Sequence, residues 1–226
     1  MKNIILNEDC RHFHSLHKYI SYDYIFTVPP DYDELNLTPH KDDEEYRTFL
    51  KTVLSGFIPR KNVCTIAITD RKFKGGVIDK HNVIINIMSE LGWRYISQKI
   101  WCKSYKLNLY RLNYTFVMTF GKGKIKQHHT KRYEQDIWNH TVYKHNGYDY
   151  SIALGVVKRC IENFTNESDI VYDPFMGSGT TAIASHKLGR HYVGCELNRD
   201  YYDICFDRIK MSINTDQSYQ EKIDDF

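Results

Sequence analysis

The chain has 226 residues, of which 42% are hydrophobic and 26% charged, and its formal net charge is +3. This length suits one α/β domain with its own core, and there is no stretch of about 18 apolar residues that could cross a membrane. The N-terminus, MKNIILNEDC, lacks a signal-peptide pattern, so we expect an intracellular protein, in the cytoplasm, nucleoid or nucleus. Six scattered cysteines without a C-x-x-C pair indicate reduced thiols and no zinc.

In the first half of the chain, strands and helices are predicted to alternate. Apolar runs predict strands at residues 4–6, 24–26 and 63–68, and helical spacing predicts helices at 11–20, 46–54 and 81–91. The second strand stops at Pro29 and Pro30, because two prolines cannot continue a central strand. Residues 69–76 are interpreted as a polar loop. Since ligands bind at the carboxyl ends of strands in open α/β sheets, the Pro-Pro turn is a candidate site.

In the second half, residues 93–101 and 114–120 are predicted to pair as an antiparallel hairpin, followed by a loop over 121–147. Helical spacing then predicts helices at 151–164 and 201–211. We therefore expect a single domain over 1–212, and a polar C-terminal tail over 213–226 that is poorly ordered. The basic loop region 102–148 would be its minimal target-recognition segment.

Charge is distributed unevenly along the chain. Residues 102–148 contain nine Lys or Arg and two acids, whereas 31–45 contain seven acids and one lysine. A basic segment favours a polyanionic partner such as nucleic acid, although each lysine alone could belong to a solvated face. Candidate contacts are Lys103, Lys106, Arg111, Lys122, Lys124, Lys126, Lys131 and Arg132, with a second patch of Arg71, Lys72 and Lys74. His128, His129, His140 and His145 are interpreted as surface histidines, so no metal site is expected.

Residues 171–181, VYDPFMGSGTT, form a glycine-rich corner between a predicted strand and a predicted helix. Gly177 and Gly179 would let a ligand lie against bare backbone, and the helix start would present N–H groups to an anionic group. The next predicted strand ends in Glu196, whose carboxylate could accept hydrogen bonds from ribose hydroxyls. The pattern indicates a nucleoside-bearing cofactor.

The corner alone leaves the cofactor open. Gly177, Gly179 and Ala182 also match the G-x-G-x-x-A dinucleotide fingerprint, and Glu196 follows Gly177 by 19 residues. An NAD-dependent enzyme is therefore an alternative, as is a simple glycine turn. A phosphate-binding P-loop is disfavoured, because its Gly-Lys-Ser/Thr ending is absent.

The Pro-Pro strand end, followed later by DPFMGSGTT, resembles the amino-methylating DNA methyltransferases that use S-adenosylmethionine, in their circularly permuted (beta-type) order. Residues 100–124 are similar to the hairpin motif of that family, and 188–209 to the motif after its cofactor loop. The resemblance implies a Rossmann-like methyltransferase fold with a seven-stranded, mostly parallel sheet and an antiparallel hairpin. It also implies a site-specific enzyme that methylates adenine N6 or cytosine N4 in DNA.

The resemblance also implies roles for individual residues. The methionine end of the cofactor would lie against the glycine corner, Glu196 would bind its ribose, and Asp9 would face its adenine amino group. Asp9 follows Glu8 where the family has glycine, so a helix cap is an alternative for Asp9. The implied cofactor-binding residues are Asp9, Thr27, Asp173, Pro174, Phe175, Gly177, Gly179, Thr180, Thr181 and Glu196.

The catalytic motif departs from the family pattern. It reads Val28, Pro29, Pro30, Asp31 and Tyr32, whereas the family begins with a side-chain acceptor and has an aromatic residue directly after the prolines. The family holds the hydrogens of the target amine on two acceptors, that side chain and a proline carbonyl. Here the Pro29 carbonyl remains, Asp31 and Thr27 are candidates for the missing acceptor, and Tyr32 is the candidate for stacking on the base.

Several alternatives follow from Val28. One is a catalytically impaired subunit that binds nucleic acid or positions a catalytic partner, and another is an RNA amino-methyltransferase. Methylation at cytosine C5 is disfavoured, since it needs a cysteine nucleophile, usually after proline, and no Pro-Cys occurs. Because there is little room for a separate target-recognition domain, any sequence specificity is expected to come from loops or from a partner, either a second copy in a homodimer or a heteromeric subunit.

Overall fold

The computed structural model describes residues 3–103, 112–125, 135–140 and 152–224, and side chains as far as residue 214. Its main sheet has a run of parallel strands, each a short apolar segment, and all except the edge strand are largely buried from both sides. Their bounds, in sheet order, are β1 (Ile4–Leu6), β10 (His191–Cys195), β9 (Ile170–Asp173), β2 (Tyr24–Thr27) and β3 (Val63–Ile68).

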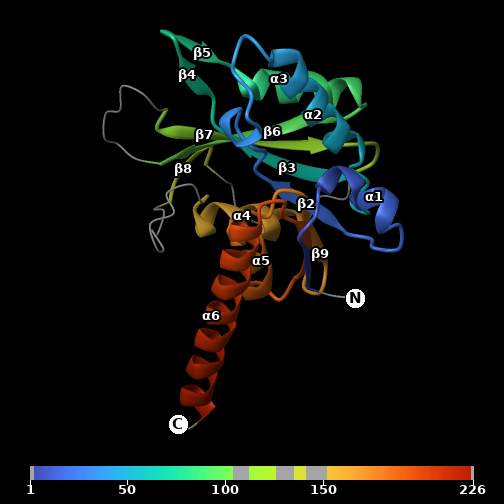
Figure 1. The fold of residues 1–226 in the computed structure, drawn as a ribbon. Coiled ribbons are helices and arrows are strands. Elements are labelled where there is room, and N and C mark those ends of the chain that lie inside the picture. The colour runs from blue at the N-terminus through green and yellow to red at the C-terminus, as the bar shows by residue number, and fades with distance from the viewer. Residues whose placement is uncertain (1–2, 104–111, 126–134, 141–151, 225–226) are drawn as a thin grey trace.

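The predicted hairpin extends this sheet. β7 (Tyr114–Gly121) pairs antiparallel with both β3 and β6 (Arg94–Cys102). β8 (Ile137–Asn139) then pairs parallel with β6, in a segment predicted to be loop. The described sheet therefore has eight strands instead of the expected seven, in the order β1-β10-β9-β2-β3-β7-β6-β8 (Figure 1).

Helices cover both faces of the sheet (Figure 1). Successive residues of β2 point to opposite faces, so Ile25 packs into one core and Tyr24 and Phe26 into the other. On the Ile25 side lie α1 (Phe13–Leu16), α2 (Asp43–Ser55) and α3 (Lys80–Glu90). On the other side lie α4 (Leu154–Phe164), α5 (Thr180–Lys187) and α6 (Arg199–Asp224).

Three segments differ from expectation. The helix predicted over 11–20 is only a 3-10 turn, η1 (Cys10–His12), followed by the four-residue α1. The polar loop contains a small hairpin of β4 (Arg71–Phe73) and β5 (Gly76–Ile78), because Lys74 and Gly75 adopt positive φ values of 46° and 81° and turn the chain. The last helix, predicted over 201–211, is α6 and extends to Asp224.

The described residues contain no helix long and apolar enough to span a membrane. All six cysteines are free thiols. Within the described ranges, no three His, Cys, Asp or Glu side chains gather as metal ligands would. His140 belongs to those ranges, whereas His128, His129 and His145 lie outside them.

Parallel pairing brings four loops to one edge of the sheet. Glu196 follows β10, and the glycine corner follows β9. The Pro-Pro turn follows β2, and Thr69 and Asp70 follow β3. Since these strands run in the same direction, all four loops leave from their carboxyl ends. This edge is the candidate site.

Candidate active site

Asp173, at the end of β9, is the buried centre of the edge. It is 2% exposed, and its carboxylate accepts hydrogen bonds from Thr27 Oγ1 at 2.7 Å, Thr181 Oγ1 at 2.6 Å and the Phe175 N–H at 3.0 Å. Burial raises the pKa of Asp173 to about 6, against the opposing effect of these three donors. The hydrogen bonds of Asp173 therefore connect β9 to β2 and to the start of α5.

The glycine corner has the backbone that its sequence predicts. Gly177 and Gly179 adopt φ values of 54° and 86°, where other residues are strained. A Cβ at Gly179 would lie 2.5 Å from Cys205 Sγ, so α6 packs directly against the corner. Around Gly177, by contrast, the nearest atom to such a Cβ would be the Phe175 carbonyl oxygen at 3.9 Å. The corner is closed on the α6 side and open at Gly177.

Two side chains hold the corner from the β10–α6 segment. Glu196 Oε2 accepts the Gly177 N–H and Oε1 accepts the Asn198 N–H, both at 2.8 Å. Partial burial raises the pKa of Glu196, while these backbone donors oppose the rise. Arg208 donates to the Ser178 carbonyl and hydroxyl, each at 2.5 Å. The sequence did not indicate a role for Arg208, because Arg208 lies 30 residues after Ser178 and no local pattern links the two residues.

Asp9 behaves as a helix cap. Its carboxylate accepts the Arg11 backbone N–H at 2.9 Å and pairs with the Arg11 guanidinium at 2.5 Å. The Arg11 side chain lowers the pKa of Asp9. The cap that the sequence left as an alternative is thus present, and Arg11 contacts both carboxylate oxygens of Asp9.

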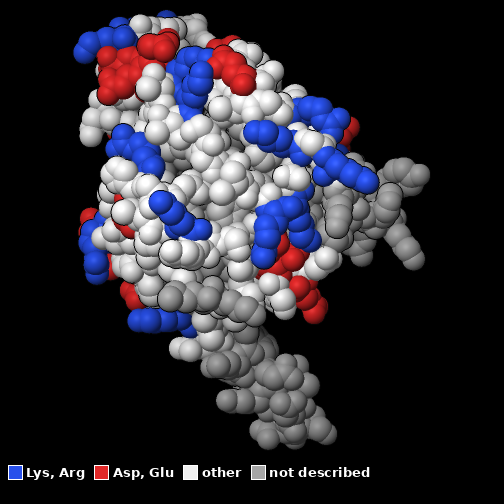
Figure 2. Space-filling model, turned by 90° about the vertical axis from the view of Figure 1, so that its right-hand side faces the viewer, with Lys and Arg blue, Asp and Glu red and all other residues white. Residues whose placement is uncertain are grey.

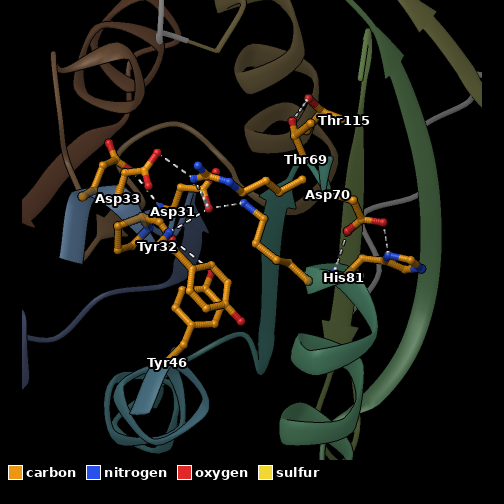
Figure 3. Close-up of polar contacts among 12 residues, drawn as sticks. Asp31, Tyr32, Asp33, Tyr46, Thr69, Asp70, His81 and Thr115 are labelled. Carbon is orange, nitrogen blue, oxygen red and sulfur yellow. Dashed lines mark hydrogen bonds and ion pairs between the residues drawn. The ribbon is translucent and has the colours of Figure 1, made fainter. Parts of the chain in front are cut away.

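The Pro-Pro turn is held by stacked tyrosines. Tyr46 Oη donates to the Pro30 carbonyl at 3.0 Å, and the Tyr46 ring stacks on Tyr32 with centroids 4.1 Å apart. Tyr32 is 1% exposed, and its hydroxyl donates to Asp43 at 2.9 Å (Figure 3). The Tyr32 ring is thus buried in the core, and in this structure it is not presented for the predicted stacking on a base.

Asp31 is the half-buried acid of the turn. Its Oδ1 lies 3.0 Å from Lys80 Nζ and 3.6 Å from Arg71, and accepts the Tyr32 N–H at 2.7 Å. Arg71 also pairs with Asp33 at 2.7 Å. Burial lowers the pKa of Lys80, while Asp31 counteracts that effect. Sequence reasoning missed Lys80, whose side chain is only 4% exposed, because nothing local pairs it with Asp31.

A second polar cluster follows β3. His81 Nδ1 lies 2.7 Å from Asp70 Oδ2, and the Thr69 and Thr115 hydroxyls are 2.8 Å apart (Figure 3). Lys103 donates to Thr69 Oγ1 at 2.6 Å. Of these residues, only Lys103 was predicted as a site residue.

The structure separates the predicted basic residues. Arg71, Lys72 and Lys74 lie on the β4–β5 hairpin, with Lys103 bonded to Thr69 at the same edge. Lys122 and Lys124 follow Gly121, which pairs with Val63 at the amino end of β3, so they lie at the opposite edge. Basic side chains form separate groups on the face shown in Figure 2. The remaining candidates, Lys106, Arg111, Lys126, Lys131 and Arg132, lie outside the described residues.

Solved structures show the same fold. A DNA modification methylase from Thermus thermophilus, complexed with S-adenosyl-L-methionine, is 20% identical with a TM-score of 0.73, over 94% of each chain. PvuII DNA methyltransferase, described as cytosine-N4-specific, is 15% identical with a TM-score of 0.77, over 95% of this chain and 92% of that one. The fold is that of a Rossmann-like methyltransferase.

Sequence comparison identifies the family. The profile of the DNA methylase family (N6_N4_Mtase) matches residues 22–207, and the chain belongs to this family. Type II methyltransferase M1.MboII of Moraxella bovis is 50% identical over 46 residues, 20% of this chain and 18% of the relative. M.HinfI of Haemophilus influenzae is 27% identical over 127 residues, 49% of this chain and 32% of the relative. The matched segments thus span about a third or less of these relatives.

Proposed function

We propose that this chain is a site-specific DNA methyltransferase that moves a methyl group from S-adenosylmethionine to an exocyclic amine, adenine N6 or cytosine N4. The observation that carries the proposal is the 2.7 Å bond between Thr27 and Asp173. It joins the strand before the Pro-Pro turn to the strand before the glycine corner. A methyl donor on the corner and an amine on the turn would therefore be neighbours, as transfer between them requires.

The corner fits S-adenosylmethionine. Gly177 leaves open space beside the backbone, and the first N–H groups of α5 suit the carboxylate of an amino acid. Each Glu196 oxygen accepts one backbone N–H and keeps capacity for a ribose hydroxyl. Asp173 would support the methionine end by holding Phe175 in place. When bound, the cofactor supplies an electrophilic methyl group on a sulfonium.

The turn supplies two acceptors for the hydrogens of the target amine. The Pro30 carbonyl accepts a hydrogen bond from the Tyr46 hydroxyl. The Pro29 carbonyl accepts no side-chain hydrogen bond from the described residues. The Asp31 carboxylate faces Lys80, Arg71 and the Tyr32 N–H through Oδ1, and within the described part of the chain no hydrogen bond reaches Oδ2. Thr27 is disfavoured as this acceptor, because its side chain is fully buried beneath the turn. We assign the role of the missing Val28 acceptor to Asp31, oriented by Lys80.

Nucleoside analysis tests the function. The protein is incubated with DNA and with labelled S-adenosylmethionine, and the digested nucleosides are identified by mass spectrometry. We expect label in N6-methyladenine or N4-methylcytosine, and the product names the target base. Label in RNA alone would change the substrate class, and no label in either nucleic acid would favour a scaffold that positions a catalytic partner.

Calorimetry tests the cofactor separately. We expect S-adenosylhomocysteine to bind and NAD not to bind, because residues 22–207 match a DNA methylase family. Binding of NAD alone would overturn the proposal.

Asp31→Asn should lower kcat by about 10²–10³. The amide oxygen of asparagine would face Lys80 and Arg71 at the Oδ1 position, so its NH2 donor would replace the acceptor Oδ2. Asp33→Asn is the matched control, since this neighbouring acid is 69% exposed and also pairs with Arg71.

A further inference from the structure

Arg11 occupies the carboxylate of Asp9, the group that the family resemblance links to the adenine amino group of the cofactor. Asp9 Oδ1 accepts the Arg11 backbone N–H at 2.9 Å and Nε at 3.0 Å, and Oδ2 accepts Nη2 at 2.5 Å. A carboxylate has about four acceptor positions, and Arg11 uses most of them. Asp9 therefore keeps little capacity for an adenine amino group, and it fixes the plane of the Arg11 guanidinium.

The same guanidinium lies over an aromatic ring. Arg11 Cζ is 5.6 Å from the centroid of the Phe49 ring on α2. The Phe49 ring in turn lies 5.9 Å from the ring of Phe175 at the glycine corner. Guanidinium groups are planar and weakly hydrated, and they stack on aromatic faces, so Phe49 supports Arg11 from one side. Because the Arg11 side chain is 46% exposed, a ligand can reach it.

Arg11 lies at the edge of the sheet where the cofactor would end. β9 pairs with β10, and β10 pairs with β1, so the loops after them follow in the order glycine corner, Glu196, Arg11. The Asn7 side-chain amide donates to the Glu196 carbonyl at 2.8 Å and fastens the loop after β1 to the loop after β10. Neighbouring strands are about 4.8 Å apart. The order of the loops thus matches the order of methionine, ribose and adenine in S-adenosylmethionine.

We propose that the Arg11 guanidinium, held by Asp9 and supported by Phe49, is the platform on which the adenine ring of the cofactor stacks. This inference rests on the proposed function, which places the methionine end at the glycine corner and the ribose at Glu196. Guanidinium planes stack on nucleobases as they do on aromatic side chains. Asp9 is then a positioning residue, which acts on adenine through Arg11.

A direct hydrogen bond from the adenine amino group to Asp9 is the competing arrangement. It would require the Arg11 guanidinium to leave Asp9. Charge-assisted hydrogen bonds are roughly twice as strong as neutral ones, and the amino group offers a neutral donor in exchange for a charged one. The exchange is unfavourable, so Arg11 stays on Asp9 when the cofactor binds.

Calorimetry with S-adenosylhomocysteine tests the platform. Arg11→Ala should raise Kd about 5–30-fold, as expected for the loss of one cation–π contact at a partly exposed site. Arg11→Lys keeps a charge beside Asp9 but loses the plane, so it should lose a similar share of the affinity. Arg159→Ala is the matched control, because Arg159 Cζ also lies 5.6 Å from a ring centroid, that of Trp138 at the other end of the sheet. Its Kd should match the wild type.

A double-mutant cycle separates the two roles of Asp9. Asp9→Ala should weaken binding in the wild-type background and have no effect in the Arg11→Ala background, because Asp9 acts through Arg11. Equal losses in the two backgrounds would show a direct contact between Asp9 and adenine, and would overturn the inference. Tm of each variant confirms that it is folded.

The Arg11 variants give two further outcomes that would overturn the inference. One is wild-type affinity in folded Arg11→Ala or Arg11→Lys. The other is tighter binding by Arg11→Ala, which would show that the guanidinium blocks adenine. A wild-type protein that does not bind S-adenosylhomocysteine would instead overturn the cofactor site of the proposed function, so the two failures are distinguishable.

Discussion

Thr27 and Asp173 lie 146 residues apart in the sequence, and the Thr27 hydroxyl donates a 2.7 Å hydrogen bond to Asp173 Oδ1 in the core. Thr27→Val keeps the shape of the side chain but leaves a buried carboxylate oxygen short of a donor. We expect a loss of about 1–3 kcal/mol in the free energy of unfolding, measured by urea denaturation. Thr52→Val, on the exposed face of α2, is the control and should change stability by less than about 0.5 kcal/mol.

The raised pKa of Asp173 predicts how stability depends on pH. Its ordinary value is 3.8 and its folded value is about 6, so the folded chain binds this proton more tightly than the unfolded chain. The stabilisation is fully present below about pH 4 and is lost as pH rises through about 6, by on the order of 2–3 kcal/mol. Asp173→Asn should remove this slope in urea unfolding from pH 4 to 7.

The control for this pH series is Asp207→Asn, because Asp207 is exposed on α6. Its stability curve should run parallel to that of the wild type. Parallel curves for Asp173→Asn and the wild type would contradict the prediction.

Gly179 is expected to tolerate no side chain. Gly179→Ala combines a positive φ of 86° with a Cβ 2.5 Å from Cys205 Sγ, so strain and overpacking add. We expect a loss of about 2–4 kcal/mol in stability, together with weaker binding of S-adenosylhomocysteine by calorimetry. Gly75→Ala has a similar φ of 81° and nothing within 4 Å, so it reports the strain alone. Equal losses in the two variants would show that packing of α6 on the corner is unimportant.

Replacement of Val28 by a residue with a side-chain acceptor is expected to increase the rate of methyl transfer. Val28→Asp or Val28→Ser places an acceptor at the first position of the motif, and we expect turnover to rise in the nucleoside assay. Val28 packs against the core cluster around α4, so Tm of each variant must be measured beside the rate. An unchanged or lower rate in a stable variant would indicate that Asp31 already supplies the full effect.

The separation of the basic residues predicts different effects on DNA binding. Lys103→Ala, at the edge with the Pro-Pro turn, should weaken binding to all sequences and reduce the salt slope by about 1. Lys122→Ala, at the opposite edge, should leave both unchanged, and it serves as the matched control. Fluorescence anisotropy over a range of salt concentrations measures both. An equal loss in the two variants would require a DNA path that spans both edges.

Local patterns in the sequence predicted the strands and turns that form the backbone of the site. Runs of buried β-formers marked β2, β3, β9 and β10, two prolines marked the end of β2, and the glycines marked the corner before α5. These features depend on backbone preferences and on burial over a few residues, which neighbouring residues determine. The resemblance to a methyltransferase family rested on the same segments, and the family match confirmed it.

Only the tertiary structure decided which side chains come together at these strands and turns. Tyr32 follows the prolines as an aromatic base partner would, yet contact with Tyr46 from α2 buries it. Lys80 reaches Asp31 because the start of α3 is hydrogen-bonded to Asp70 after β3, and Lys122 lies at the other edge because β7 runs antiparallel. Such contacts join residues far apart in the chain, so they depend on strand order and register. Local sequence patterns do not encode either of these.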